Sequence, residues 1–482
     1  MSNDAIFALL PLITLSTVIL ALMLLIAFRR NLALTCGVAV SGCILTLCSI
    51  FLVNNTGVPQ QVTPLLVVDG YALIFSAMIV MVTGFICVLA YEYYKCRGEQ
   101  QDEFYLLLLL SCLGGMTLAH STHFASLILG LELLGVALYG LIAFPSRGRL
   151  SLEAGLKYLI LSGVSSAFIL FGVALLYASF GSLSFSALSA AASAGTNPLF
   201  VLVGTGLIFA GVSFKLSLVP FHMWTPDVYQ GAPAPTTAFL ATASKGSIFA
   251  VILRFFISLD GYQYTTILEG LFWIALASIL FGNLLALMQT NLKRLLAYSS
   301  IAHLGYLLVA FLAASYVGGK ALAVEAVIFF LLAYLLTSLG AFGVITLMST
   351  DPDSPDNDEL PQYQGLFWRR PIMAMFFSAM LLSLAGIPLT AGFVGKFYIL
   401  TAAVQAELWV LLGAVVIGSG IGLFYYLRII FAMTEQPSAN DEITMPVVGG
   451  WAMATLTLIM LTLGIYPSPI INWVSEIARL MT

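Results

Sequence analysis

Three lysines, one glutamate and one histidine lie inside long apolar runs of this sequence, where charged groups are rare. They are Glu132, Lys215, Lys245, His303 and Lys396. A charged side chain at the centre of a bilayer costs about 2.5–3.5 kcal/mol on insertion scales, so such residues must face protein or water. Ionisable groups placed in this way usually mark a route for ions or protons. The five residues are therefore candidates for a proton path.

A second interpretation stays open for each of these residues. A long basic side chain can extend its charged end to the membrane interface, or it can form a structural ion pair. This interpretation suits Lys157, Arg254 and Arg428, which lie near the ends of apolar runs. Taken alone, His303 is equally well explained as a satisfied polar group of the core. Glu153 lies four residues before Lys157, and we expect these two to pair on one helix face.

The composition identifies the class of protein that must hold these groups. Of the 482 residues, 61% are hydrophobic and only 8% are charged, against about 25% charged residues in soluble domains. This predicts an all-α polytopic membrane protein and excludes a soluble Rossmann or TIM-barrel enzyme. The net charge of −4 and the lack of a basic tract argue against nucleic acid as a partner.

The sequence has no pattern for a metal ion or a redox cofactor. The six cysteines form no C-x-x-C pair, and the four histidines form no H-E-x-x-H motif. A Walker A motif and a G-x-G-x-x-G turn after a strand are also lacking. We therefore expect no cofactor and no metal in this chain. It can belong to a redox enzyme only if other chains carry the electrons.

Apolar helical runs predict about fourteen transmembrane helices of roughly 20 residues each. The predicted spans are 6–28, 32–53, 68–91, 104–119, 124–144, 155–178, 199–223, 234–257, 265–288, 295–315, 322–348, 371–404, 407–431 and 447–467.

The basic residues predict the orientation of these spans. With fourteen crossings, twelve basic residues fall on one side and three on the other, so the first side is cytoplasmic by the positive-inside rule. Both termini then face the outer side of the membrane. The first side holds Arg29, Arg30, Lys95, Arg97, Arg147, Arg149, Lys157, Lys293, Arg294, Arg369, Arg370 and Arg428, and the opposite side holds Arg254, Lys320 and Arg479.

Two spans are predicted to be discontinuous, and each holds one of the buried lysines. Pro220 follows Lys215 in the seventh span, and Gly386 and Pro388 precede Lys396 in the twelfth. Proline removes a backbone hydrogen bond, and in lipid the freed groups need protein or water partners. Broken helices at corresponding positions of two halves are typical of transporter repeats.

The spacing of the candidate residues suggests where the repeats lie. Within a single membrane domain (1–482), we expect a first five-helix repeat at 104–257, helices four to eight. A second repeat is expected at 265–431, helices nine to thirteen. An odd number of spans in each repeat makes the two copies inverted in the membrane.

Three stretches of the sequence resemble the antiporter-like, proton-pumping subunits of respiratory complex I, the NADH–quinone oxidoreductase. They are SFKLSLVPFHMWTPDVYQGAPAP (213–235), NLKRLLAYSSIAHLGYLL (291–308) and SLAGIPLTAGFVGKFYIL (383–400). The sequence is most similar to the bacterial N-type subunit. Lys396 fits that type, because the M-type subunit has a glutamate there. We do not expect the L type, because its long lateral helix has no counterpart in the sequence up to Thr482.

The resemblance implies a proton-translocating subunit without cofactors of its own. It implies that Glu132 on helix five pairs with Lys215 on helix seven and that Lys245 on helix eight continues the path. His303 matches a position of the central hydrophilic axis, and Lys396 matches the residue near the exit. FMN, iron–sulfur clusters and quinone are expected in partner subunits. The implied neighbours are an M-type subunit, the small K-type and J-type membrane subunits, and lipids.

Three other classes of function remain open at this point. A subunit of an Mrp-like cation/proton antiporter would have the same fold and the same lysines. A solute transporter should show polar and aromatic residues converging at the helix breaks, which the sequence does not clearly contain. A membrane scaffold should tolerate apolar residues at Lys215, Lys245 and Lys396.

Overall fold

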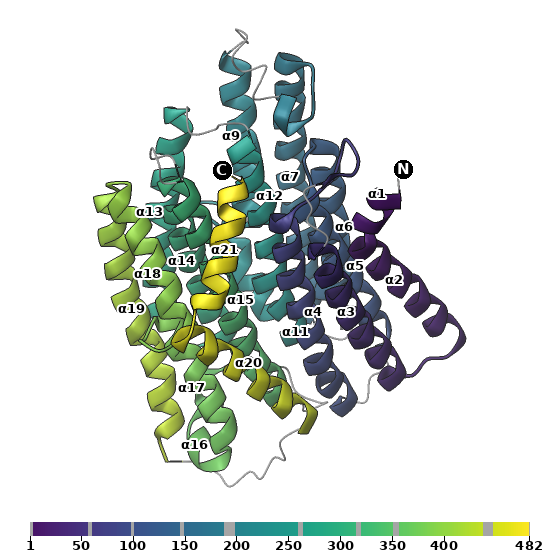
Figure 1. The fold of residues 1–482 in the computed structure, drawn as a ribbon. Coiled ribbons are helices and arrows are strands. Elements are labelled where there is room, and N and C mark those ends of the chain that lie inside the picture. The colour runs from purple at the N-terminus through teal and green to yellow at the C-terminus, as the bar shows by residue number, and fades with distance from the viewer. Residues whose placement is uncertain are drawn as a thin grey trace. The chain divides into compact units, whose positions relative to one another are not determined.

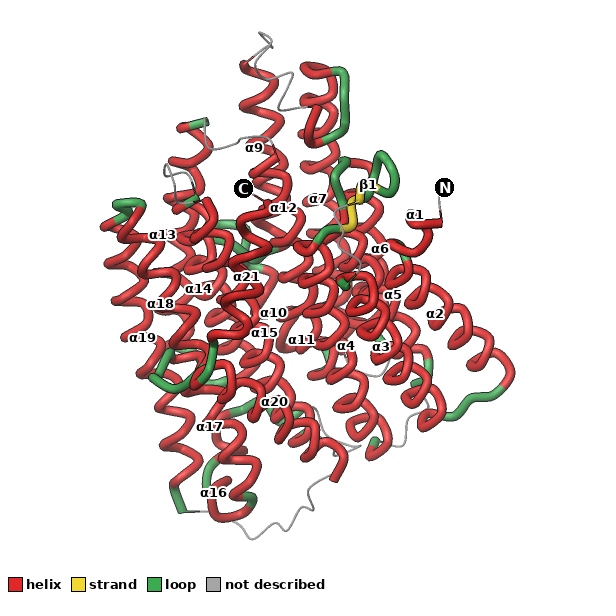
Figure 2. The backbone as a smooth tube through the Cα atoms, in the orientation of Figure 1, coloured by secondary structure: helices red, strands yellow, loops and turns green. Residues whose placement is uncertain are grey.

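The computed structural model describes residues 3–55, 60–97, 101–144, 149–187, 198–258, 264–314, 320–349, 356–436 and 447–481. Within these ranges the chain is almost entirely helical (Figure 2). One antiparallel pair of two-residue strands joins β1 (Gln60–Gln61) to β2 (Val67–Val68), with Gln61 opposite Val67. Arg147, which was used to predict the orientation, lies outside the described residues.

The helices follow one another in the order shown by the colours of Figure 1. They are α1 (Asn3–Ala8), α2 (Leu10–Phe28), α3 (Leu32–Asn54), α4 (Gly70–Cys96), α5 (Glu103–His120), α6 (Phe124–Ala143), α7 (Arg149–Phe180), α9 (Pro198–Lys215), α10 (Trp224–Gly231), α11 (Ala234–Phe239), the π-helix η1 (Leu240–Ser244), α12 (Lys245–Ser258), α13 (Thr265–Leu287), α14 (Leu292–Ala313), α15 (Lys320–Met348), the 3-10 helix η3 (Leu360–Tyr363), α16 (Leu366–Arg369), α17 (Pro371–Ala385), α18 (Ala391–Gln405), α19 (Trp409–Thr434), α20 (Val447–Ile465) and α21 (Ser468–Met481).

The polytopic all-α prediction is confirmed. In the described part of the chain, twelve helices are long and apolar enough to cross a membrane. Two shorter apolar helices, Leu199–Lys215 and Pro371–Ala385, coincide with the two spans predicted to be broken. The total of fourteen crossings stays a prediction. The amphipathic helix α21, which follows the last predicted span, was not anticipated.

Both predicted breaks are present, and their positions refine the prediction. Helix α9 ends at Lys215, five residues before Pro220, so the lysine is the last residue of its helix. Helix α17 ends at Ala385, and Gly386 follows with φ of +88°. Glycine suits this position because other residues adopt positive φ only with strain. A third irregularity, the π-helix η1, directly precedes Lys245.

The helices group into two compact units. Unit 1 comprises residues 1–84, 101–224 and 243–271, and unit 2 comprises 85–100, 225–242 and 272–482. In unit 1, α7 packs along α6 and α9, and α5 packs along α6 and α12. Most of the predicted first repeat falls in unit 1 and nearly all of the second in unit 2. The inverted symmetry of the repeats stays a prediction.

Helix α15 forms the centre of unit 2. It contacts α11, α14, α17, α18, α20 and α21, and its most apolar window is completely buried. A helix that is apolar on all sides is stable only when other helices surround it. Figure 1 shows α21, drawn in yellow, next to α15, on which it buries Val474, Ile477 and Ala478.

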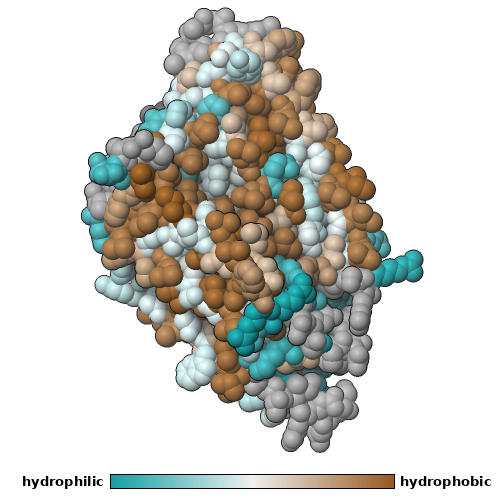
Figure 3. All heavy atoms as spheres, turned by 90° about the vertical axis from the view of Figure 1, so that its right-hand side faces the viewer, coloured by the Kyte–Doolittle hydropathy of each residue, from teal (hydrophilic) through white to brown (hydrophobic). Residues whose placement is uncertain are grey.

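The outward faces of the peripheral helices are apolar. On α7, Leu156, Ile160, Val164 and Phe171 are each exposed by about half or more, at helical spacing. Figure 3 shows broad hydrophobic areas on one face of the molecule. A soluble protein rarely exposes such surfaces, so these faces suit contact with lipid chains.

Of the two alternatives given for Arg254, the structure confirms the structural ion pair and not extension to the interface. Its side chain is 7% exposed and donates to both carboxylate oxygens of Asp69, at 2.7 and 2.8 Å. The guanidinium also lies 4.7 Å from the centroid of the Tyr71 ring. Paired in this geometry, the charge can stay inside unit 1. By contrast, the predicted pair of Glu153 and Lys157 is present at 2.8 Å and is exposed.

Asp356 joins three parts of unit 2. One carboxylate oxygen accepts from Lys293 and from the backbone N–H of Ala234, the first residue of α11. The other accepts from Arg97 at 3.0 Å and from the Tyr93 hydroxyl at 2.7 Å. Burial alone would raise the pKa of Asp356, but the two cations outweigh burial and hold it below its usual range.

We predict that Asp356→Asn destabilises the protein, because it leaves the Lys293 and Arg97 charges without a buried anion. Breaking a buried pair costs about 3–5 kcal/mol, so the thermal midpoint of the purified protein should fall clearly. A matched control is Glu153→Gln, which breaks an ion pair whose side chains are 54% and 41% exposed. Exposed pairs contribute at most about 1 kcal/mol.

The pH dependence tests the same assignment. Because the folded-state pKa of Asp356 is lowered, its stabilisation is complete above the unfolded pKa of about 3.9 and is lost as the pH falls through the folded value. The difference between wild type and Asp356→Asn should therefore be constant from about pH 5 to pH 8. A difference that disappears within this range would contradict the buried ion pair.

We also predict that Gly392→Ala disrupts the break between α17 and α18. A Cβ at this position would overlap the backbone carbonyl oxygen of Ser383, which cannot move without shifting the end of α17. The control is Gly413→Ala in α19, where a Cβ would meet nothing within 4 Å. The yield of folded, assembled protein should fall for Gly392→Ala only, and equal yields would argue against tight packing at the break.

Candidate functional site

Lys396 lies in α18, one turn after the break, and is 7% exposed. Its Nζ donates to the carbonyl oxygen of Ala385 at 2.8 Å and lies 5.5 Å from the centroid of the Tyr306 ring. Ala385 is the last residue of α17, so the break frees the carbonyl group that the lysine bonds. The broken helix thus provides a neutral acceptor for a buried amine.

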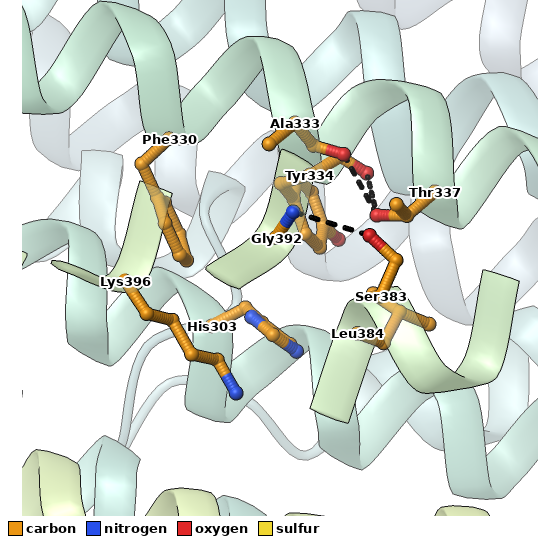
Figure 4. Close-up of a pocket in the computed structure, with 9 residues that line it drawn as sticks. All are labelled: His303, Phe330, Ala333, Tyr334, Thr337, Ser383, Leu384, Gly392 and Lys396. Atoms are coloured by element: carbon orange, nitrogen blue, oxygen red, sulfur yellow. Dashed lines mark hydrogen bonds between the residues drawn. The ribbon is translucent and has the colours of Figure 1, made fainter. Parts of the chain in front are cut away.

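A small cavity brings Lys396 and His303 together within unit 2. It is lined by residues of α14, α15, α17 and α18, among them Phe330, Tyr334 and Ser383. Figure 4 shows the Lys396 amine and the His303 imidazole on the same side of this cavity. The space that the centre of a water molecule can occupy in this cavity is about 10 Å³. This is room for about one water molecule.

Side chains also close the break itself. Ser383 Oγ in α17 accepts from the backbone N–H of Gly392 in α18 at 3.1 Å (Figure 4). The Thr390 side chain caps α18 by accepting from the Phe393 N–H at 3.4 Å. These bonds satisfy backbone donors that the interruption leaves without helical partners. The geometry around Lys396 is therefore held by specific contacts on both sides of the break.

The buried imidazole of His303 contacts a tyrosine that the sequence analysis did not single out. His303 Nε2 lies 3.3 Å from the Tyr426 hydroxyl of α19, and this hydroxyl also bonds Ser299. A second buried pair joins Ser300 to Tyr334 at 2.6 Å. Ser299 lies one helical turn before His303, which is a signal that was present in the sequence. The position of Tyr426 required the three-dimensional packing.

Unit 1 holds Glu132 and Lys215 on two serines of α7. Lys215 Nζ donates to Ser162 Oγ at 2.5 Å, and Ser166 Oγ donates to Glu132 Oε1 at 2.7 Å. Tyr139 of α6 also bonds Ser162, at 2.8 Å. Among the described residues, no direct ion pair joins Glu132 to Lys215. The two groups instead bond neighbouring hydroxyls, one turn apart on α7.

The end of α9 at Lys215 is stabilised locally. The indole Nε1 of Trp224 donates to the carbonyl oxygen of Phe214 at 2.9 Å, and the two rings stack with centroids 5.4 Å apart. Ser165 of α7 donates to the carbonyl oxygen of Gly211 at 2.8 Å. These contacts hold the last turn of α9 against α7, which places Lys215 beside Ser162.

Lys245 is 1% exposed and is the first residue of α12 after the π-helix. Single π-helical turns occur frequently at functional sites. Thr242 within the π-helix bonds the carbonyl oxygen of Ala238. All three lysines singled out in the sequence are thus buried, and each lies at or near an irregular helix segment.

A hydroxyl oxygen can accept a hydrogen bond from an ammonium or donate one to a neutral amine. Ser162 therefore suits either protonation state of Lys215, and the carbonyl of Ala385 accepts from Lys396 in both states. Within the described residues, no group of three or more His, Cys, Asp or Glu side chains could hold a metal ion. The chemistry available to the described site is proton exchange between amines, hydroxyls and an imidazole.

Comparisons with known proteins show the family to which this chain belongs. The model of the transmembrane family of NADH:quinone oxidoreductases and Mrp antiporters matches residues 121–422, which is more than half of the chain. A chain of respiratory complex I from Thermus thermophilus is 32% identical. The match covers 96% of this chain and 98% of that one, with a TM-score of 0.82.

Two other solved structures have similar folds. A chain of the archaeal membrane-bound sulfane sulfur reductase is 25% identical, with a TM-score of 0.85 and coverage of 99% and 97%. A chain of the Mrp complex from a Dietzia species is 21% identical, with a TM-score of 0.85 and coverage of 100% and 98%; this likeness concerns the fold alone. The chain belongs to the family of antiporter-like membrane subunits that NADH:quinone oxidoreductases and Mrp antiporters share.

Proposed function

We propose that this chain is the N-type, proton-translocating membrane subunit of a bacterial NADH–quinone oxidoreductase. The observation that carries the proposal is the burial of Lys215, Lys245 and Lys396, each at or near an irregular segment of an otherwise apolar helix. The 32% identity to a complex I chain over nearly its full length supports this assignment over other members of the family.

In the proposed mechanism, protons move along Glu132, Lys215, Lys245, His303 and Lys396. Glu132 and Lys215 bond serines one turn apart on α7, so a small movement of either side chain changes the distance between their charges. A nearby carboxylate favours the charged form of an amine, and burial favours the neutral form. Bringing the glutamate closer thus loads the lysine with a proton, and withdrawing it releases the proton.

The energy for this cycle comes from redox chemistry in other subunits. We propose that this chain carries no cofactor and that FMN, iron–sulfur clusters and quinone belong to its partners. M-type, K-type and J-type membrane subunits are the proposed neighbours, with lipids around the apolar faces. The proposed location is the bacterial inner membrane with both termini periplasmic.

The alternative is a subunit of an Mrp-like cation/proton antiporter. The Mrp chain shares the fold, and the same buried lysines would serve either function. The two functions differ in whether proton movement is coupled to NADH oxidation in partner subunits.

We predict that Lys215→Arg abolishes proton pumping while the complex still assembles. An arginine keeps the charge but does not deprotonate in proteins, so it cannot pass a proton. Proton uptake into inverted membrane vesicles should be lost, whereas electron transfer from NADH to an artificial acceptor should persist and report assembly. The control is Lys157→Arg, at an exposed ion pair. Normal pumping by the assembled Lys215→Arg complex would reject the mechanism.

A second prediction separates the two candidate functions. When the chain is purified with its natural partners, we expect NADH oxidation coupled to quinone reduction and to proton movement. Reconstituted vesicles should show no sodium–proton exchange in the absence of NADH. Sodium-dependent exchange by an assembly without NADH oxidation would instead support the antiporter.

A further inference from the structure

A chain of buried hydroxyl groups leads to His303 from the first turns of α14. Ser299 Oγ and the Tyr426 hydroxyl share a hydrogen bond, and this hydroxyl lies 3.3 Å from His303 Nε2. Ser299 is 2%, Tyr426 1% and His303 4% exposed. The three groups therefore form a continuous polar connection inside unit 2, shielded from solvent.

The other nitrogen of the imidazole is available for a second partner. Among the described residues, His303 Nδ1 is buried without a hydrogen-bond partner. The ring lines the cavity that also contains Lys396 (Figure 4). One ring nitrogen contacts a hydroxyl group, and the ring also lines the cavity. An imidazole in this position can accept a proton at one nitrogen and release a proton from the other.

We propose that Ser299, Tyr426 and His303 form a proton relay that supplies Lys396, with Tyr426 as a further proton-carrying residue. In one step, a hydrated proton from the N-terminal side of α14 protonates Ser299 Oγ, and the original Ser299 proton moves to the Tyr426 oxygen. The Tyr426 proton passes to His303 Nε2, and the Nδ1 proton leaves for the neutral Lys396 amine. Each bond to hydrogen that breaks is replaced, so one proton moves and both hydroxyls stay neutral.

The relay rests on the proposed function but adds an inlet to it. Lys293 and Arg294 lie in the first turn of α14, at its predicted cytoplasmic end, and Ser299 lies between this end and His303. A proton entering here joins the proposed path at His303. Tyr306, whose ring lies beside Lys396, bonds Asn283, and Asn283 also bonds Tyr425.

Tyr425 provides a matched control for Tyr426. Both tyrosines are 1% exposed and adjacent in α19, with ring centroids 4.5 Å apart. The Tyr425 hydroxyl donates to Asn283 Oδ1 at 3.2 Å, whereas the Tyr426 hydroxyl contacts His303. Replacing either tyrosine by phenylalanine removes one buried hydroxyl. The Tyr425 hydroxyl also interacts with Tyr426 and Ser299, but only Tyr426→Phe removes the hydroxyl that contacts His303.

We expect Tyr426→Phe to lower the number of protons pumped per NADH oxidised in the intact complex, because the inlet through Ser299 no longer reaches His303. Tyr425→Phe should lose clearly less, because it leaves the contact between Tyr426 and His303 in place. The double variant Tyr426→Phe, His303→Gln should be no worse than the more impaired single variant, because residues of one relay act as a unit. Assembly is measured by NADH oxidation with an artificial acceptor.

Several outcomes would overturn the relay. Full pumping by assembled Tyr426→Phe would exclude the tyrosine as a carrier, and equal losses in both tyrosine variants would indicate a structural effect. Losses that multiply in the double variant would place Tyr426 outside the path of His303. If the wild-type assembly itself pumps no protons, the proposed function fails, which is a result distinguishable from all of these.

Discussion

The structure depends on one constraint: inside an apolar environment every freed backbone group and every buried charge needs a partner within the protein. At the end of α17, the carbonyl of Ala385 finds its partner in the amine of Lys396. At the end of α9, the carbonyl of Phe214 is bonded by Trp224, while Lys215 bonds Ser162. A helix break leaves backbone groups without partners, and a buried lysine leaves its amine without water. When the two lie together, groups at the break and on neighbouring helices can bond the amine.

The sequence predicted that buried lysines lie near helix breaks, because both features can be recognised from residue types. A lysine within an apolar run is unusual, as is a proline or a positive-φ glycine within a span, so the pairs Lys215 with Pro220 and Lys396 with Gly386 were recognisable. The position of the first break was less accurate. Helix α9 ends at Lys215 rather than at Pro220, because the backbone leaves the helical conformation already at Ser217, where φ is +62°.

Partners contributed by distant segments could not be read from the sequence. A structural ion pair was one of two alternatives for Arg254, but its partner, Asp69, lies 185 residues away and was not identified. Asp356 lies in a polar segment, and its partners Lys293 and Arg97 come from two other helix ends. Tyr426 looked like one more aromatic residue of an apolar helix. In each case local composition describes the segment, whereas the contact depends on packing between helices.

The partners also sort the buried cations into two chemical kinds. Arg254 and Lys293 face carboxylates, and an opposite charge in a low-dielectric interior favours one protonation state strongly. Lys215 and Lys396 instead bond a serine hydroxyl and a backbone carbonyl, which are neutral and serve a charged or an uncharged amine. The first kind suits permanent structure and the second suits groups that gain and lose protons. The neutral hydroxyls beside His303 belong to the second kind, and this is why a route through them is chemically consistent with the rest of the site.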